Sequence, residues 1–195
     1  MKKILSIILL IFSLSAHGAT ISEALRLSGN GKHEKALEIL NPLAEKGDVD
    51  ALGNLGNMYA FGNGVEKDLS IAYKYWKKAS EKHLGSAMGN IASLYMIGGG
   101  GLEKNTTEAV KWYKKAAEHR HFYSMLTLSQ LYETGLGIEK NTINALAWSG
   151  LATTNSPSEQ LKQKASVQMR AIAKGMKKED ITEAQKRTYE LVKNY

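Results

Sequence analysis

The sequence predicts an all-α protein, an α-solenoid of stacked helix–turn–helix repeats closed by a C-terminal helical cap. The main observation is internal similarity: Tyr59, Tyr95 and Tyr132 end three similar segments and lie 36 and 37 residues apart. A glycine-rich turn and a second apolar segment follow each tyrosine. Proline is rare, with two residues among 195, so the chain can form long helices. Two helical segments in a repeat of this length are typical of a solenoid.

Residues 1–18 have the layout of a secretory signal peptide. Two lysines follow the first methionine, Ile4–Leu14 is mostly apolar, and small residues precede an expected cleavage between Gly18 and Ala19. An uncleaved anchor helix is the alternative, but the apolar run has about half of the ~20 residues that a membrane span requires. No cysteine follows the run, so a lipoprotein anchor is excluded. We therefore expect an exported protein that is periplasmic or secreted.

Residues 19–48 predict a degenerate N-terminal repeat. The stretch Thr20-Ile-Ser-Glu23 resembles a capping box that begins a short helix. Glycines at 29 and 31 end that helix. A second helix is expected over Glu34–Lys46, because its alanine, leucine and isoleucine residues recur on one side at helical spacing.

Residues 49–153 predict three full repeats of two helices each. In the first copy Ala51, Leu55 and Tyr59 fall on one helical stripe, and Ala72 and Trp76 mark one face of the second helix. Such short helix pairs cannot bury their apolar faces alone, so the copies are expected to stack. One polar residue in each copy is expected to N-cap the second helix: Asp68, Asn105 and Asn141.

Residues 154–195 predict a two-helix cap over the open end of the stack. Ser156 is expected to N-cap the first of these helices, with Pro157 in its first turn. That helix should end near Lys174, and a last helix should cover about 179–193. A solenoid requires such a cap for solubility.

The repeated pattern Ala-x3-Leu-Gly-x2-Tyr-x2-Gly-x-Gly-Val-x2-Asp, followed by Ala-x3-Trp-x-Lys-Ala, resembles the Sel-one-like repeat family, relatives of tetratricopeptide repeats. The resemblance covers residues 48–153 well and 20–47 loosely. It implies a right-handed superhelix whose concave face holds a protein partner. His83 and Arg120 stand where the family often has a glycine, and we expect them to alter the local turns. In the first full copy the matching residues are Ala51, Leu55, Gly56, Tyr59, Gly62, Gly64, Val65, Asp68, Ala72, Trp76 and Ala79.

The composition argues against several kinds of chemistry. There are no cysteines, which excludes thiol chemistry and cysteine-ligated metals. No Ser-x-x-Lys or Gly-x-Ser-x-Gly motif occurs, which argues against a β-lactamase or an α/β-hydrolase. His119 and His121 flank a turn without a further ligand fixed nearby in sequence. We therefore expect no catalytic residue, no cofactor and no metal.

The formal net charge is +7, or +5 without Lys2 and Lys3. The lysines are interspersed with acidic residues and arginine is rare, which argues against nucleic-acid binding. The lysine pairs 77–78 and 114–115 are expected to form a solvated convex face. Peripheral contact with an anionic envelope surface stays open as an alternative, and no membrane span is expected in the mature protein.

Positions that vary between otherwise similar copies are the candidates for partner binding, since repeat proteins use such positions to line a binding face. Apolar residues near the helix ends extend this set, although Phe61 and Ile97 are equally compatible with a core position. The candidates are Asn54, Asn57, Phe61, Asn90, Ser93, Met96, Ile97, Thr127 and Gln130.

The predicted function is an exported scaffold that holds a protein partner on its concave face. The resemblance implies one sharper form, an immunity-type neutraliser of a toxic lipase or phospholipase. Two other classes stay open. One is a peptidoglycan- or envelope-associated module, and the other is a cell-wall or β-lactam hydrolase.

Overall fold

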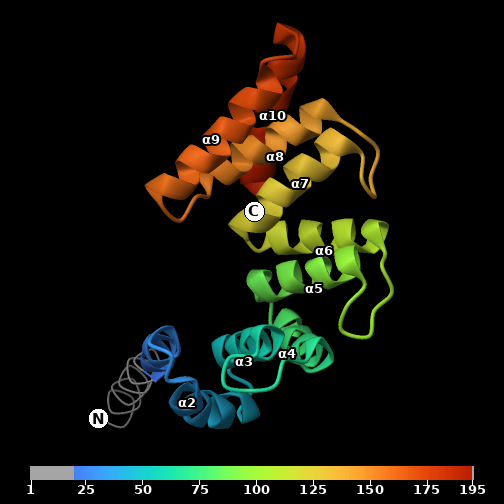
Figure 1. The fold of residues 1–195 in the computed structure, drawn as a ribbon. Helices are drawn as coiled ribbons and strands as arrows, with labels where there is room; N and C mark the ends of the chain where they lie inside the picture. The colour runs from blue at the N-terminus through green and yellow to red at the C-terminus, as the bar shows by residue number, and fades with distance from the viewer. Residues whose placement is uncertain (1–19, 195) are drawn as a thin grey trace, which may run out of the picture. The chain divides into compact units, whose positions relative to one another are not determined.

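The computed structural model describes residues 20–194, and this part of the chain consists of helices joined by short turns, without strands (Figure 1). The predicted all-α repeat solenoid is confirmed. The chain divides into two compact units, one ending at Ala79 and one beginning at Ser80. The predicted signal peptide, residues 1–18, lies outside the described residues. Among the helices that are described, none is long and apolar enough to cross a membrane.

The first unit contains residues 20–48, for which a degenerate repeat is predicted, and most of the first full copy. Residues 20–29 are helical. They are followed by α2 (His33–Glu45), α3 (Val49–Phe61) and α4 (Leu69–Glu81), the last of which ends just inside the second unit. The buried core of this unit combines Ala24 and Leu27 of the first helix with Leu40 of α2 and Leu55 and Met58 of α3. The apolar stripes expected from the sequence therefore face one another.

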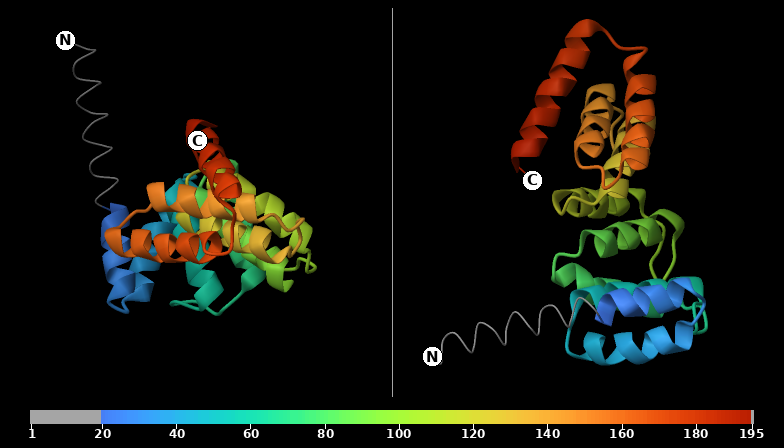
Figure 2. Two further views of the ribbon diagram at one scale, coloured as in Figure 1. Left: turned by 90° about the horizontal axis from the view of Figure 1, so that it is seen from above. Right: turned by 90° about the vertical axis from the view of Figure 1, so that its left-hand side faces the viewer.

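The second unit contains two further copies and the C-terminal cap. Its helices are α5 (Gly85–Ile97), α6 (Thr106–Glu118), α7 (Phe122–Thr134), α8 (Thr142–Thr154), α9 (Glu159–Ala173) and α10 (Lys178–Asn194). Consecutive helices from α5 to α8 pack in order, and α8 contacts both α9 and α10. Figure 2 shows α9 and α10 diverging from their shared turn with α8 between them. Both C-terminal helices thus pack on the last helix of the third copy, and their role as a cap stays a prediction.

The turn inside each full copy follows one pattern. The first helix ends at a glycine in the left-handed region, Gly62, Gly98 or Gly135, whose N–H donates to the carbonyl four residues earlier. The predicted N-caps are confirmed: the Asp68 side chain accepts from Ser70 and Ile71, and Asn105 and Asn141 accept from Glu108 and Asn144. The glycine and the cap together fix the start and end of these helices.

The predicted cap at Ser156 is wrong. The N-cap of α9 is Ser158, whose Oγ accepts from the backbone N–H of Leu161 at 3.3 Å. The Ser156 hydroxyl instead donates to the backbone carbonyl of Ser158 at 2.8 Å. Both serines offer the same acceptor, so the helix can begin two residues later than expected.

The turn between copies keeps one conformation whether or not it contains glycine. Gly47, His83 and Arg120 occupy equivalent positions with φ of 80°, 67° and 58°. The expectation that His83 and Arg120 would alter this turn is therefore wrong, because both adopt the left-handed conformation of the glycine. For a residue with a Cβ this conformation costs about 1–2 kcal/mol, which the surrounding packing must offset.

In the first and third full copies, the glycine before the Val or Ile of the inter-helix turn lies close to the preceding copy, whereas a Cβ at Gly101 of the second copy meets nothing within 4 Å. A Cβ at Gly64 would lie 2.6 Å from the Cβ of His33, at the start of α2. A Cβ at Gly137 would lie equally close, 2.6 Å, to the backbone of Thr106 at the start of α6. In these two copies the turn therefore rests on the first turn of a helix in the preceding copy, which explains why glycine stands at this position.

Candidate partner-binding surface

The candidates on α3 are not equally free to bind a partner. Asn54 is half exposed, and its amide donates to the backbone carbonyl of Asp50 at 2.8 Å. The Asn57 side-chain oxygen accepts a hydrogen bond of 3.1 Å from the indole N–H of Trp76. Trp76 is only 5% exposed, and its indole ring is part of the packing of α3 against α4. The Asn57 oxygen therefore provides the acceptor for the N–H of a buried ring. Asn57 therefore has a structural task besides any contact with a partner.

Phe61 and Ile97 are exposed side chains and not core residues. Phe61, at the end of α3, is 74% exposed, and Ile97, at the end of α5, is 67% exposed. Each stands two residues after the repeat tyrosine of its own copy. Met96 beside Ile97 is half-buried. The two alternatives left open by the sequence are thus resolved in favour of surface apolar contacts.

The remaining candidates lie on α5 and α7 of the second unit. Asn90 is half-buried, whereas Ser93 and Gln130 are exposed. The Ser93 hydroxyl lies 3.0 Å from that of Tyr113 on α6. Burial raises the pKa of Tyr113, and the bond to Ser93 partly opposes this rise. Thr127 donates to the backbone of Tyr123 at 2.9 Å. Their role in binding stays a prediction.

A cleft of about 330 Å³ in the second unit brings together charged and aromatic side chains from four helices. The sequence analysis did not single it out, because its lining residues are spread from α6 to α10. Among them the sequence pattern had marked Tyr132 only as a repeat position and Lys114 only as part of a solvated face. The lining consists of Lys114 and Glu118 of α6, Tyr132 of α7, Asn144 and Trp148 of α8, and Arg187, Glu190 and Leu191 of α10.

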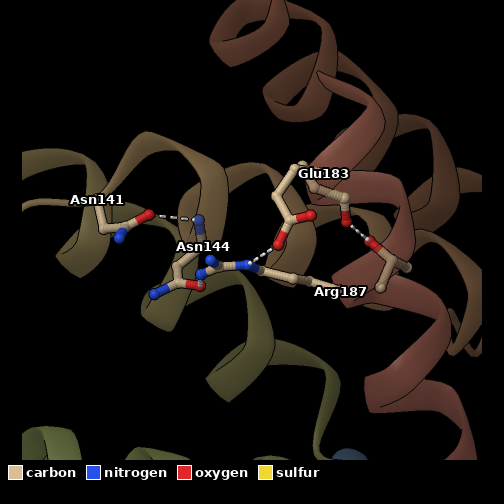
Figure 3. Close-up of polar contacts among 6 residues, drawn as sticks. Asn141, Asn144, Glu183 and Arg187 are labelled. Carbon is tan, nitrogen blue, oxygen red and sulfur yellow. Dashed lines mark hydrogen bonds and ion pairs between the residues drawn. The ribbon is translucent and has the colours of Figure 1, made fainter. Parts of the chain in front are cut away.

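Arg187 is held in a fixed position at this cleft (Figure 3). Its Nε donates to Glu183 Oε1 at 3.0 Å, and its Nη1 donates to the side-chain oxygen of Asn144 at 2.6 Å. The backbone N–H of Asn144 in turn donates to the N-cap residue Asn141 at 2.9 Å. The guanidinium therefore ties α10 to the start of α8, and its other N–H groups are available for an acceptor.

Lys114 provides a second cation at the cleft. Its Nζ lies 5.7 Å from the centre of the Tyr132 ring, within the range of a cation–π interaction. In the part of the chain that the structure describes, Lys114 forms no ion pair. Glu118 and Glu190 add two exposed carboxylates. The cleft thus offers both signs of charge beside the rings of Tyr132 and Trp148.

A second cavity, of about 450 Å³, lies between α8, α9 and α10 and is mainly apolar. Leu146, Met169 and Ile181 are among its lining residues and belong to the small core of the cap. The hydroxyls of Thr153 and Thr188 on its wall donate to backbone carbonyls of their own or adjacent helices. This cavity therefore offers apolar contacts and few free donors, in contrast to the cleft.

Comparison with known proteins agrees with this architecture. The Sel1 repeat family model matches residues 49–84, 85–121 and 123–155. A Sel1 repeat protein from Oxalobacter formigenes is similar in structure, with a TM-score of 0.65, 25% identity, and coverage of 90% of this chain and 85% of that one. A protective antigen of uropathogenic Escherichia coli strains with an SLR fold has a TM-score of 0.62 at 22% identity, over 95% of this chain and 48% of that chain.

An uncharacterized Sel1-like repeat-containing protein of Schizosaccharomyces pombe is 39% identical over 68 residues. The match covers 34% of this chain and 10% of that protein. The chain therefore spans about a tenth of the length of this curated relative.

Proposed function

The chain belongs to the Sel1 repeat family, and from this premise we propose that it holds a protein partner at the cleft between α6 and α10. Sel1 repeat proteins are protein–protein interaction scaffolds, and their fold is typically non-catalytic. The proposal therefore concerns the surface that binds and the chemistry that it offers.

The observation that carries the proposal is the guanidinium of Arg187, fixed by two hydrogen bonds, in a cleft that Tyr132 and the largely buried Trp148 also line. Arginine, tyrosine and tryptophan are the residue types that dominate the binding energy of protein interfaces. A side chain already held by two hydrogen bonds loses less conformational entropy when a partner binds. Charges of both signs beside aromatic walls suit a polypeptide segment that presents polar and apolar groups together.

A stable interface extends beyond a cleft of this size, since each partner buries about 800 Å² in a standard complex. We therefore propose that the contact continues over exposed candidates of the same unit, Ser93 and Gln130. Ile97, exposed in the same unit, provides a further apolar contact, and Phe61 is proposed as an apolar contact of the first unit by itself. These assignments are supported by exposure and residue type.

We further propose that the chain binds its partner outside the cytoplasm. We also propose that this partner is a toxic enzyme, which the chain neutralises by occluding its active site. The first part is supported by the signal-peptide pattern of residues 1–18. The second rests on the resemblance to the repeat family, which implies an immunity-type neutraliser as one form of the scaffold. A neutraliser requires a rigid binding surface and no catalytic group of its own, which suits a helical repeat scaffold.

The test is a charge reversal at the cleft with a matched control in the same unit. The cleft variant carries Lys114→Glu and Glu190→Lys, and the control carries Lys140→Glu and Glu139→Lys in an exposed turn. Both keep the net charge. A partner captured from source-cell extract by the full chain is purified, and its Kd is measured against wild type and both variants.

We expect a one-to-one complex that the cleft variant weakens at least about tenfold, which is about 1.4 kcal/mol, while the control binds like wild type. Equal binding by the two variants would refute the assignment of the cleft. A wild-type chain that cosediments with peptidoglycan or anionic vesicles, and with no protein, would refute the scaffold function itself.

A further inference from the structure

Two histidines from neighbouring copies lie against each other in the second unit. The ring centres of His83 and His119 are 5.0 Å apart, with 29° between the ring planes. Both residues are exposed. The residue equivalent to His83 in the next copy is Arg120, and His119 directly precedes it. Stacking of the two copies brings their turns together, so the ring pair joins two neighbouring copies.

The local backbone positions both rings. His83 occupies the left-handed position of its turn, with φ of 67°, where the equivalent residue of the preceding copy is Gly47. His119 is the C-cap residue of α6. A Cβ at Gly85 would lie 2.9 Å from the carbonyl oxygen of His119 and 3.1 Å from its Cβ. The glycine at the start of α5 therefore lets the end of α6 approach until the two imidazoles meet.

The spacing of the rings suits a shared metal ion. A metal–nitrogen distance of about 2.0–2.1 Å and an angle of about 90–110° at the ion place the centres of two ligating imidazole rings about 4.5–5.2 Å apart. The observed 5.0 Å falls in this range. The site requires that rotation about the side-chain bonds turn one nitrogen of each ring toward a common point, and both side chains are exposed.

We propose that His83 and His119 bind one divalent transition-metal ion of borderline softness, with Cu²⁺ bound more tightly than Ni²⁺ or Zn²⁺. Imidazole suits these three ions, and copper(II) is the most strongly bound in the divalent series. The described residues contain no group of three or more histidine, cysteine or carboxylate ligands that could hold a metal. The site therefore supplies two protein ligands, water completes the coordination, and the ion is exchangeable and not structural.

His121 is close to His119 in sequence, but its ring has a different structural role. Its Nδ1 lies 2.8 Å from the Ser124 hydroxyl. A Cβ at Gly89 would lie 2.7 Å from the same nitrogen, so the ring packs directly on α5. His121 is thus committed to packing, which makes it a control in the experiment below.

The experiment titrates the full-length chain with Cu²⁺ alone, using calorimetry in a non-coordinating buffer and electron paramagnetic resonance. We expect one bound ion per chain, with two imidazole nitrogens visible in the resonance spectrum. His83→Gln and His119→Gln should each weaken binding at least about tenfold, because even groups that only support metal ligands contribute 10–100-fold. His17→Gln, His33→Gln and His121→Gln should bind like wild type.

Gly85→Ala provides a test with both imidazoles retained. The new Cβ displaces the His119 backbone, so binding should weaken although no ligand is lost. Circular dichroism and melting curves establish that each variant is folded. Substitution of the two exposed histidines should change neither the circular dichroism spectrum nor the melting temperature. Unaltered copper binding by the His83→Gln, His119→Gln double variant would overturn the site and leave the ring pair a packing contact.

Discussion

At the scale of single residues, the repeat positions divide into packing and surface roles that the pattern alone does not separate. Gly56 and Asn57 are adjacent on α3, and both contact Trp76 of α4. The glycine leaves room for the indole ring, and the asparagine accepts its N–H. The sequence identified Gly56 through the family pattern, but it placed Asn57 among variable surface positions because its partner lies 19 residues away.

Substitution of Gly56 by alanine should destabilise the first unit by about 1–3 kcal/mol, the usual cost of overpacking a well-packed core. The added Cβ would lie 2.5 Å from two atoms of the Trp76 ring, so the ring must move. Gly29→Ala is the matched control, because a Cβ at that helical glycine meets nothing within 4 Å. Denaturant unfolding followed by circular dichroism measures both. Equal stability of the two variants would show that Trp76 adjusts without cost.

Asn57→Ala should cost about 1–3 kcal/mol of stability, because it leaves the indole N–H of Trp76 without this acceptor in a largely buried site. Asn54→Ala removes only a bond from Asn54 to its own helix, so a change within about 0.5 kcal/mol is expected. Thermal melting of the two variants compares them directly. A larger loss for Asn54 would mean that the roles of these two asparagines have been exchanged.

Stability should decrease in mild acid through His121. Burial lowers the pKa of this histidine below its ordinary value of 6.5. In the unfolded chain the His121 imidazole binds a proton near pH 6.5, whereas in the folded chain it does so only at lower pH. The stabilisation from the neutral ring is therefore full above about pH 6.5 and is lost as the pH falls through the native pKa. Melting temperatures at about pH 7.5 and about pH 5.5 should differ less for His121→Gln than for wild type. An identical pH dependence of both proteins would contradict this role.

At the scale of helices, most boundaries could be predicted because glycine stops and asparagine or aspartate caps recur in every full copy. A residue that starts a helix by accepting free N–H groups is recognisable in the sequence. The start of α9 could not be predicted to the residue, since Ser156 and Ser158 carry the same hydroxyl on either side of Pro157. In the structure the Ser156 hydroxyl donates to the Ser158 carbonyl, which leaves Ser158 as the cap, and the capping pattern alone does not distinguish the two serines.

Asn105→Ala should destabilise the second unit by about 1 kcal/mol, since it removes the acceptor for the Glu108 N–H at the start of α6. Asn105→Asp should retain the cap and its stability. Chemical denaturation measures the difference between the two variants. A similar loss in both would mean that the side-chain amide of Asn105, and not its oxygen, makes the stabilising contact.

At the scale of the molecule, the repeat number and the all-α solenoid follow from periodicity, because each copy carries the same apolar stripes. The cleft could not be predicted, since it depends on how α10 packs on α8 at the side where α6 also lines the cleft, and that path has no periodic counterpart. Its key contact joins Arg187 to Asn144 across 43 residues. The proximity of His83 to His119 was predictable in principle only to the level of the turns, because stacked copies bring equivalent turns together, and His119 directly precedes the residue equivalent to His83.

The central claim, a protein partner bound at the α6–α10 cleft, is tested most directly by photo-crosslinking in the source cells. A photoreactive residue replaces Glu190 at the cleft, or the exposed Lys140 in a turn of the same unit as a control. We expect one cross-linked product of defined mass from position 190 and no product from position 140. Adding Lys114→Glu should abolish the product from position 190. The same products from both positions, or no product from position 190, would contradict the claim.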